Sequence, residues 1–225
     1  MLGGFDPNNR VTAGLYDWLG LSREGMVHWR IWQLGTHAFL HGNWLHFIPN
    51  VLVVYMIGGR VMHIIGRRGF ALVFGGGVLL AAILHLLFHP ANPMGTGAAV
   101  HSPLVGASGG AMALLLVLTS LSPDSKMWPL PVSGKNLGRG LLLASLLLFL
   151  VTPGLGIPGL SGIGRWLMSF GEVEAEGVAP IFQIGHIYHF GGGLMGLLYG
   201  RWLLRRPITL AELQRRRAKR EGLAA

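Results

Sequence analysis

The sequence predicts an all-α membrane protein, a polytopic bundle of five hydrophobic helices. Two observations lead to this fold class. Only 12% of the 225 residues are charged and 51% are hydrophobic, whereas a soluble domain has about 25% charged residues. The hydrophobic residues are also gathered into five long runs, each close to the ~20 residues that a membrane-spanning helix needs.

The first 43 residues contain no run long enough to cross a bilayer. The apolar stretch from Val11 to Leu21 is broken by Asp17 and by two glycines. The tryptophans and charged residues around it are typical of a segment at a membrane interface. Arg10 is not followed by the continuous hydrophobic region of a secretory signal peptide. We therefore expect residues 1–43 to form an extracytoplasmic, interfacial segment.

The five hydrophobic runs define the predicted transmembrane domain, residues 44–204. Turn-forming or charged residues bound the runs, as they commonly bound helices. The predicted spans are residues 44–65, 70–88, 104–121, 141–156 and 180–204. They are joined by a short basic turn, a proline-containing loop, a polar connection and a glycine-rich loop, at residues 66–69, 89–104, 122–140 and 157–179. Residues 205–225 form a basic tail.

The positive charges predict how this domain is oriented in the membrane. Eight of the 18 lysines and arginines lie between Arg201 and Arg220, directly after the last hydrophobic run. Basic residues collect on the cytoplasmic side of membrane proteins, where they contact anionic lipid headgroups. We therefore expect an integral protein of the bacterial plasma (inner) membrane, with a cytoplasmic C-terminus and the acidic 157–179 loop outside. The same argument predicts the lipid bilayer, and no nucleic acid, as the partner of the basic tail.

The residues within the predicted spans limit the chemistry that the domain can perform. None of the spans contains an aspartate or a glutamate, and the chain has no cysteine. An intramembrane aspartyl protease needs two carboxylates, and a zinc protease of the H-E-x-x-H type needs its glutamate. Cysteine nucleophiles, thiolate metal sites and disulfides are excluded as well. A pair of serine and histidine remains available, because histidine can act as the base that activates a hydroxyl.

A serine flanked by small residues stands at the start of the third span, in Gly106-Ala107-Ser108-Gly109-Gly110. One interpretation is helix packing, because small residues let membrane helices approach each other closely. The other is catalysis, because the neighbouring glycines leave the Ser108 hydroxyl accessible to a base. This pattern alone does not distinguish the two.

Helical spacing selects the histidine that could be this base. His189 shares one helix face with Gly192 and Gly196, which form a ridge of small residues suited to close packing. His186 projects from a different face of the same helix. We therefore expect His189, rather than His186, to face the serine.

Two further polar residues belong to the same side of the membrane. His46 and Asn50 are four residues apart, so their side chains share one face of the first span. The predicted orientation places both near the outer end of the membrane, together with Ser108 and His189. This position suits hydrolysis, which needs water that the bilayer centre lacks.

The other histidines are expected to have structural or solvated positions. We expect the two that lie within other spans, His63 and His85, to be packing residues. The remaining five lie at helix ends or in loops, where we expect water to solvate them: His28, His37, His41, His89 and His101.

Three motifs, spread over about residues 32–203, resemble those of the rhomboid family. The first is His37-Ala38-Phe39-Leu40-His41, followed by His46 and Asn50. The second is Gly106-Ala107-Ser108-Gly109, and the third is His189-Phe190-Gly191-Gly192 with Gly196 seven residues after the histidine. The three occur in the order found in that family.

The resemblance implies a serine protease that cuts transmembrane protein substrates in or beside their spanning segments, without a metal or a cofactor. By position, Ser108 would be the nucleophile and His189 the general base and then the acid. The backbone N–H of Ser108 and the side chains of His46 and Asn50 would form the oxyanion hole, which stabilises developing negative charge. The 157–179 loop would correspond to the mobile cap over the site.

The chain departs from the family pattern at several positions. The family core has six spans, and the span expected before residue 29 is not found. Trp32-Gln33 stands where a Trp-Arg pair is common, Met112 where an aromatic ring is common, and Met62 where a glutamate is common. Pro49 lies between His46 and Asn50, where it removes a backbone donor.

Two other functions remain open from the residues alone. The departures suit a catalytically weak or inactive rhomboid-like protein that binds transmembrane helices. Histidine pairs at helical spacing would suit a haem or metal protein: His37 with His41 and His85 with His89.

Overall fold

The computed structural model describes residues 10–90, 103–126, 131–169, 185–205 and 214. Every regular element in these ranges is a helix, and the extended pairings found there are two isolated bridges, Leu21 with Leu104 and Lys126 with Ser133. The predicted all-α fold class is therefore confirmed.

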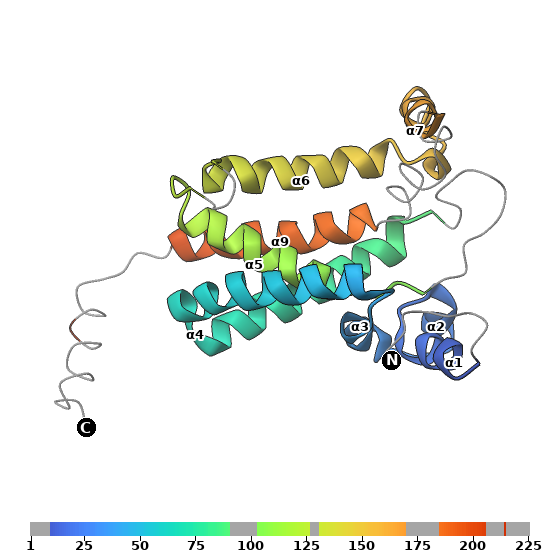
Figure 1. Ribbon diagram of the computed structural model, residues 1–225, viewed down its shortest axis with the longest axis horizontal. Helices are drawn as coiled ribbons and strands as arrows, with labels where there is room; N and C mark the ends of the chain where they lie inside the picture. The colour runs from blue at the N-terminus through green and yellow to red at the C-terminus, as the bar shows by residue number, and fades with distance from the viewer. Residues whose placement is uncertain (1–9, 91–102, 127–130, 170–184, 206–213, 215–225) are drawn as a thin grey trace.

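The N-terminal segment is a group of short helices at one end of the bundle (Figure 1). They are α1 (Arg10–Leu19), α2 (Arg23–Val27), α3 (Gln33–Thr36) and the 3-10 helix η1 (His37–Phe39). The longest has ten residues, about half of what a membrane crossing requires. As the sequence predicts, no helix described before residue 44 could span a bilayer.

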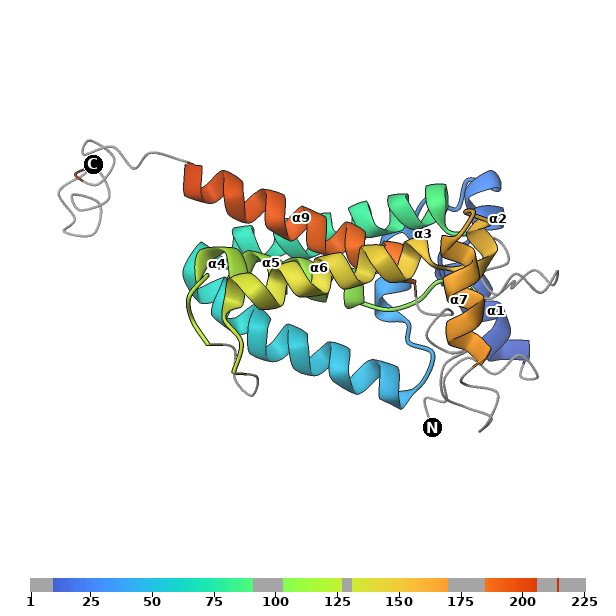
Figure 2. The same ribbon diagram turned by 90° about the horizontal axis from the view of Figure 1, so that it is seen from above.

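The longest helix, α4 (Trp44–Phe88), reverses direction at Gly66. Gly66 has φ +76° and ψ 170°, a conformation that is essentially restricted to glycine. It divides α4 into two legs, residues 44–65 and 67–88, which meet at the turn and spread apart toward their other ends (Figure 2). The predicted turn at residues 66–69 is therefore a single residue, and Arg67 and Arg68 belong to the second leg. In the described part of the chain, α4 is the helix that is long and apolar enough to cross a membrane.

The first turns of α4 show why the helix begins at Trp44. The side chain of the preceding residue, Asn43, accepts a hydrogen bond of 2.8 Å from the backbone N–H of His46, which caps the helix. Pro49 is the sixth residue of α4 and lies inside the helix. It removes the N–H that would bond the carbonyl of Leu45, but the helix continues through it.

The later helices differ at their ends from the predicted spans. Helix α5 (Ser108–Leu121) keeps the predicted end, whereas α6 (Gly134–Leu150) begins and ends earlier than the predicted residues 141–156. Polar residues at the start of α6 continue the helix outside the apolar run, and Pro153 of the 3-10 helix η2 (Pro153–Leu155) follows its end. Helix α9 (His186–Arg205) corresponds to the last predicted span.

The predicted 157–179 loop is partly helical. Residues Leu160–Ser169 form α7, a ten-residue helix, so the expectation of a loop is wrong for this part. The three glutamates of that connection lie outside the described residues, as do residues 180–184 of the last predicted span.

Helix α5 is the centre of the bundle and packs against α4 and α9. The core includes Val61 and Val73 from the two legs of α4 and Leu114 and Val117 from α5, all without exposed surface. Glycines let α9 approach the α5 backbone closely. A β-carbon at Gly192 would lie 2.1 Å from the carbonyl oxygen of Gly109, which is far too short for any side chain to be present.

The two ends of the bundle differ in what they contain. The reversal of α4, the connection between α5 and α6 and the end of α9 lie at one end, and the short N-terminal helices and α7 lie at the other (Figure 1). The described basic residues of the reversal, of the α5–α6 connection and of the last turn of α9 therefore share one end of the molecule.

Candidate active site

Ser108 and His189 meet at the end of the bundle that carries the N-terminal helices. Ser108 is the first residue of α5, and His189 lies in the first turn of α9. Nε2 of His189 lies 2.8 Å from Oγ of Ser108, and both side chains are half-buried. This hydrogen bond gives the arrangement that general-base activation of a hydroxyl requires. The side chain of His186, on another face of α9, is buried.

The close crossing of α5 and α9 sets this distance. Gly192 and Gly196 face α5, and β-carbons there would lie 2.1 Å and 2.2 Å from the carbonyl oxygens of Gly109 and Ala113. His189 lies on the same face of α9. The ridge of small residues thus brings the histidine to the serine.

His46 packs against the residue two positions before the serine. Gly106 has φ +121°, and a β-carbon there would lie 2.7 Å from Nε2 of His46. The backbone N–H of Gly42 donates a hydrogen bond of 3.4 Å to Nδ1 of His46. The ring hydrogen of a neutral His46 then resides on Nε2, on the side of Gly106, where it is available as a donor.

Asn50 is buried, and its amide is partly used within its own helix. Nδ2 of Asn50 donates a hydrogen bond of 2.7 Å to the carbonyl oxygen of His46. An amide group carries two hydrogens, so one remains for another acceptor. The His46 and Asn50 side chains are thus linked through the backbone of the first turns of α4.

The start of α5 supplies backbone donors beside the serine. An α-helix leaves its first N–H groups without intrahelical acceptors, and the N-cap residue here, Ala107, makes no side-chain capping bond. The N–H groups of Ser108 and Gly109 belong to this set. Together with the positive end of the helix dipole, they favour a negatively charged oxygen at this position.

A buried network that the sequence analysis missed holds Gly106 in place. The hydroxyl of Tyr188 donates to the carbonyl oxygen of Gly106 and lies 2.9 Å from Nε2 of His37. The backbone N–H of Gly106 donates to the carbonyl oxygen of His37 at 2.9 Å. Both polar backbone groups of Gly106 are therefore bonded by partners from the N-terminal segment and α9.

The expectation that water solvates His37 is wrong, because its side chain is fully buried. Nδ1 of His37 lies 2.7 Å from the carbonyl oxygen of Gln33, which can only accept, so this nitrogen carries a hydrogen. Burial lowers the pKa of His37 to about 4, against the bond to Gln33, which raises it. His37 is therefore neutral at pH 7, and its Nε2 shares the single hydroxyl hydrogen of Tyr188 with Gly106.

The side chain of Gln33 joins the parts of the N-terminal segment that lie next to this network. Its side chain is fully buried, donates to the carbonyl oxygen of Asp17 at 2.8 Å and accepts from the N–H of Ser22 at 3.2 Å. The hydroxyl of Tyr16 donates to the carbonyl oxygen of His41. The N-terminal segment is thus a support for the site and not a separate unit.

The remaining histidines do not form a metal centre in the described part of the chain. No group of three histidine, aspartate or glutamate side chains with suitable geometry occurs there. His85 and His89 stack with ring centroids 4.3 Å apart. His63, expected to be a packing residue, is exposed instead.

Two sequence signals could have indicated the buried network. Tyr188 directly precedes the candidate base, and its hydroxyl needs a partner when it is buried. His37 and Gln33 are four residues apart, the spacing at which side chain and carbonyl meet on one helical turn.

Most of the chain matches a model of a known protein family. A family model described as Rhomboid domain matches residues 28–206. This range contains Ser108, His189, His46 and Asn50. Among curated proteins, none matches the chain.

Proposed function

The chain belongs to the rhomboid family, and from this premise we propose that it is an intramembrane serine endopeptidase. Members of the family are integral membrane proteins, and they include proteases as well as inactive members. The chain is accordingly an integral membrane protein. The observation that supports activity is the 2.8 Å contact between Ser108 Oγ and His189 Nε2.

The proposed reaction uses Ser108 as the nucleophile and His189 as base and acid. Ser108 Oγ attacks the carbonyl carbon of a peptide bond in a transmembrane substrate while Nε2 of His189 accepts the hydroxyl proton. His189 then donates this proton to the leaving amine, and an acyl-enzyme forms on Ser108. A water molecule, deprotonated by the same nitrogen, releases the second product and regenerates the serine. No metal or cofactor takes part in these steps.

The negative charge on the tetrahedral intermediate requires donors that are already in position. We assign this role to the backbone N–H of Ser108 and to the side chains of His46 and Asn50. The Nε2–H of His46 on the side of Gly106 and the uncapped start of α5 support this assignment. Removing one such donor typically costs 10²–10³-fold in rate.

A second candidate function is the binding of transmembrane helices without cleavage. It is favoured by Asn50, because one of its amide hydrogens is bonded to the carbonyl oxygen of His46 and is not directed to an oxyanion. Met112 replaces the aromatic ring that is common in the family and adds to this alternative.

Cleavage of a transmembrane substrate by the reconstituted full chain distinguishes the two functions. We expect wild-type protein to cleave a fluorogenic transmembrane substrate and to be labelled at Ser108 by a fluorophosphonate. Ser108→Ala should lower the rate by about 10³-fold or more, since it removes the nucleophile. Ser120→Ala on the same helix is the matched control and should retain wild-type activity. Equal rates in wild type and Ser108→Ala would show that the dyad does not carry the reaction.

A further inference from the structure

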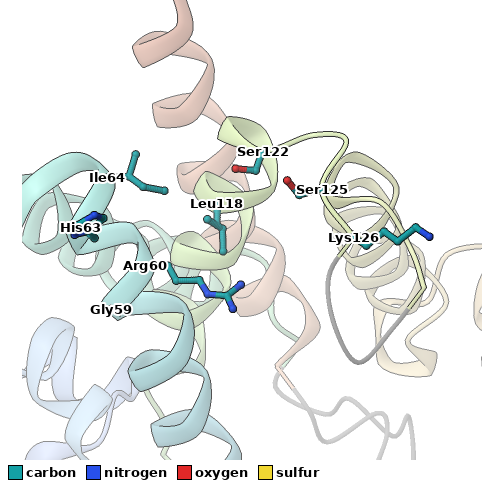
Figure 3. A pocket seen from close by; sticks show the side chains of 8 residues that line it. All are labelled: Gly59, Arg60, His63, Ile64, Leu118, Ser122, Ser125 and Lys126. Atoms are coloured by element: carbon teal, nitrogen blue, oxygen red, sulfur yellow. The ribbon is translucent and has the colours of Figure 1, made fainter.

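A second site lies at the other end of the bundle, far from Ser108 and His189. It is a pocket of about 420 Å³ between the first leg of α4, the end of α5 and the segment that follows α5 (Figure 3). Ser108 begins α5 and Ser122 caps its end, so the pocket is about 20 Å from the serine at 1.5 Å per residue. A separate ligand could occupy it while the candidate active site is engaged.

The polar groups of this pocket come from both of its walls. The guanidinium of Arg60 reaches from α4 toward α5, and the hydroxyls of Ser122 and Ser125 point back toward α4 (Figure 3). Lys126 lines the rim, with its side chain turned away from Arg60. A guanidinium with hydroxyls opposite is a donor set that suits the oxygens of a phosphate group.

Nothing in the described part of the chain neutralises Arg60. Neither a hydrogen bond nor an ion pair joins its side chain to another described residue. The acid closest in sequence to the pocket residues, Asp124, is paired with Lys135 at 2.9 Å. Arg60 is exposed and lies six residues before the turn at Gly66, so its long side chain can reach the headgroup layer, where the available anions are lipid phosphates. The charge of Arg60 therefore calls for an anion at this pocket.

The remaining wall of the pocket is apolar. Leu118 is buried at its floor and Ile64 lies on the α4 side. The volume of about 420 Å³ lies within the ~300–1,000 Å³ of small-ligand sites, which is enough for a phosphate and its neighbouring groups. A ligand with an anionic head and an adjoining hydrocarbon chain matches both walls.

We propose that this pocket binds the phosphate of an anionic phospholipid from the adjacent leaflet. Arg60 holds the phosphate oxygens together with the hydroxyls of Ser122 and Ser125, and the acyl chain lies along Ile64. The apolar wall favours a lipid over a soluble phosphate, which would leave the exposed side chain of Ile64 without a hydrocarbon partner.

Native mass spectrometry of the full chain in detergent micelles tests the proposal. The probes are phosphatidylglycerol, phosphatidylcholine and inorganic phosphate, each titrated separately, and the two anions are also titrated against each other. We expect one phosphatidylglycerol per chain to bind at least ten-fold more tightly than phosphatidylcholine. Arg60→Gln should weaken this binding about ten-fold or more, because it removes the charge-assisted bonds. Arg139→Gln, which removes an equal charge from an exposed site at the same end of the bundle, should leave it unchanged.

The outcomes separate the lipid site from its alternatives. Ser125→Ala, a small change at an exposed residue, should also weaken phosphatidylglycerol binding, and it keeps the test valid if Arg60→Gln does not fold. Equal losses in Arg60→Gln and Arg139→Gln would show non-specific attraction and overturn the site. Displacement of the lipid by an equal concentration of inorganic phosphate would assign the pocket to a soluble anion and overturn the lipid assignment.

Discussion

Tyr188 connects the candidate base to the loop that precedes the nucleophile. It is adjacent to His189 in sequence, is 1% exposed, and donates its hydroxyl hydrogen to the carbonyl oxygen of Gly106. Its hydroxyl also lies 2.9 Å from Nε2 of His37. A single hydroxyl thus fixes α9, the N-terminal segment and the residue two positions before Ser108.

Tyr188→Phe tests how strongly the site depends on this hydroxyl. The change leaves the Gly106 carbonyl without its donor, and an unsatisfied buried group costs about 1–3 kcal/mol. We expect a lower unfolding midpoint and a lower kcat with a smaller change in KM, because Gly106 moves and the substrate surface does not. Tyr199→Phe on the same helix is the matched control. Identical unfolding curves for Tyr188→Phe and wild type would contradict this role.

Other residue-level features of the site depend on tertiary neighbours and were not predictable. The residue types of Ser108 and His189 and their positions at helix starts are visible in the sequence. His37 was expected to be solvated because it lies outside the hydrophobic runs, yet the N-terminal segment covers it. Whether a loop histidine is buried is decided by segments distant in sequence, which periodicity does not report.

At the scale of elements, the contact between α5 and α9 determines the geometry of the dyad. The two helices approach until the backbone of one touches the glycine face of the other at Gly192 and Gly196. Spacing predicts this face, because glycines four residues apart lie along one side of a helix. Which helix packs against this face, and at what distance, is known only from the folded structure.

Gly192→Ala tests this contact. Its β-carbon would lie 2.1 Å from the carbonyl oxygen of Gly109, so α9 must move outward and His189 must move with it. We expect destabilisation of about 1–3 kcal/mol, as for other overpacked sites, and a large loss of any cleavage activity. Gly140→Ala in α6, where a β-carbon meets nothing within 4 Å, is the control and should not destabilise. Full activity of Gly192→Ala would mean that the crossing does not set the dyad distance.

The ends of elements were predicted less well than their existence. Hydropathy marks where a helix is apolar, and α6 continues as a helix into polar residues from Gly134. The 157–179 connection was expected to be a loop because it is rich in glycine, yet α7 forms within it. An amphipathic stretch such as Leu160–Ser169 can form a helix even where glycines are frequent, so glycine content alone does not predict a loop.

At the scale of the whole molecule, burial of a neutral histidine makes stability depend on pH. The pKa of His37 falls from 6.5 to about 4 on folding, so the unfolded chain binds more protons between these values. The free energy of unfolding is therefore unaffected by this histidine above pH 6.5. It falls as the pH decreases toward 4, by about 3 kcal/mol in all, at 1.36 kcal/mol for each pH unit.

This contribution can be measured by the unfolding midpoint in detergent from pH 7.5 to pH 4. We expect wild type to lose stability over this window and His37→Gln to show a weaker dependence, from a lower stability at neutral pH. His28→Gln at an exposed position controls for the substitution itself. Parallel curves for wild type and His37→Gln would assign the pH dependence to other groups.

The orientation of the molecule in the membrane is a further prediction at this scale. The chain has no cysteine, so single cysteines report their own accessibility. Arg165→Cys in α7 and Arg139→Cys in α6 place exposed thiols at opposite ends of the bundle. On intact cells, we expect a membrane-impermeant maleimide to label Arg165→Cys, and to label Arg139→Cys only after lysis. The reverse pattern would invert the proposed topology and place the candidate active site in the cytoplasm.

The reversal at Gly66 lets the longest helix of the protein fit within one bilayer. A straight α-helix of the 45 residues of α4 would be about 68 Å long, more than twice the ~30 Å thickness of the hydrocarbon layer. Folded in two, each half matches that thickness, and Trp44 and Phe88 return to the same membrane surface. A β-carbon at position 66 would meet nothing within 4 Å, so any other residue is disfavoured there by its backbone alone. One backbone conformation thus fits this sequence to a single bilayer.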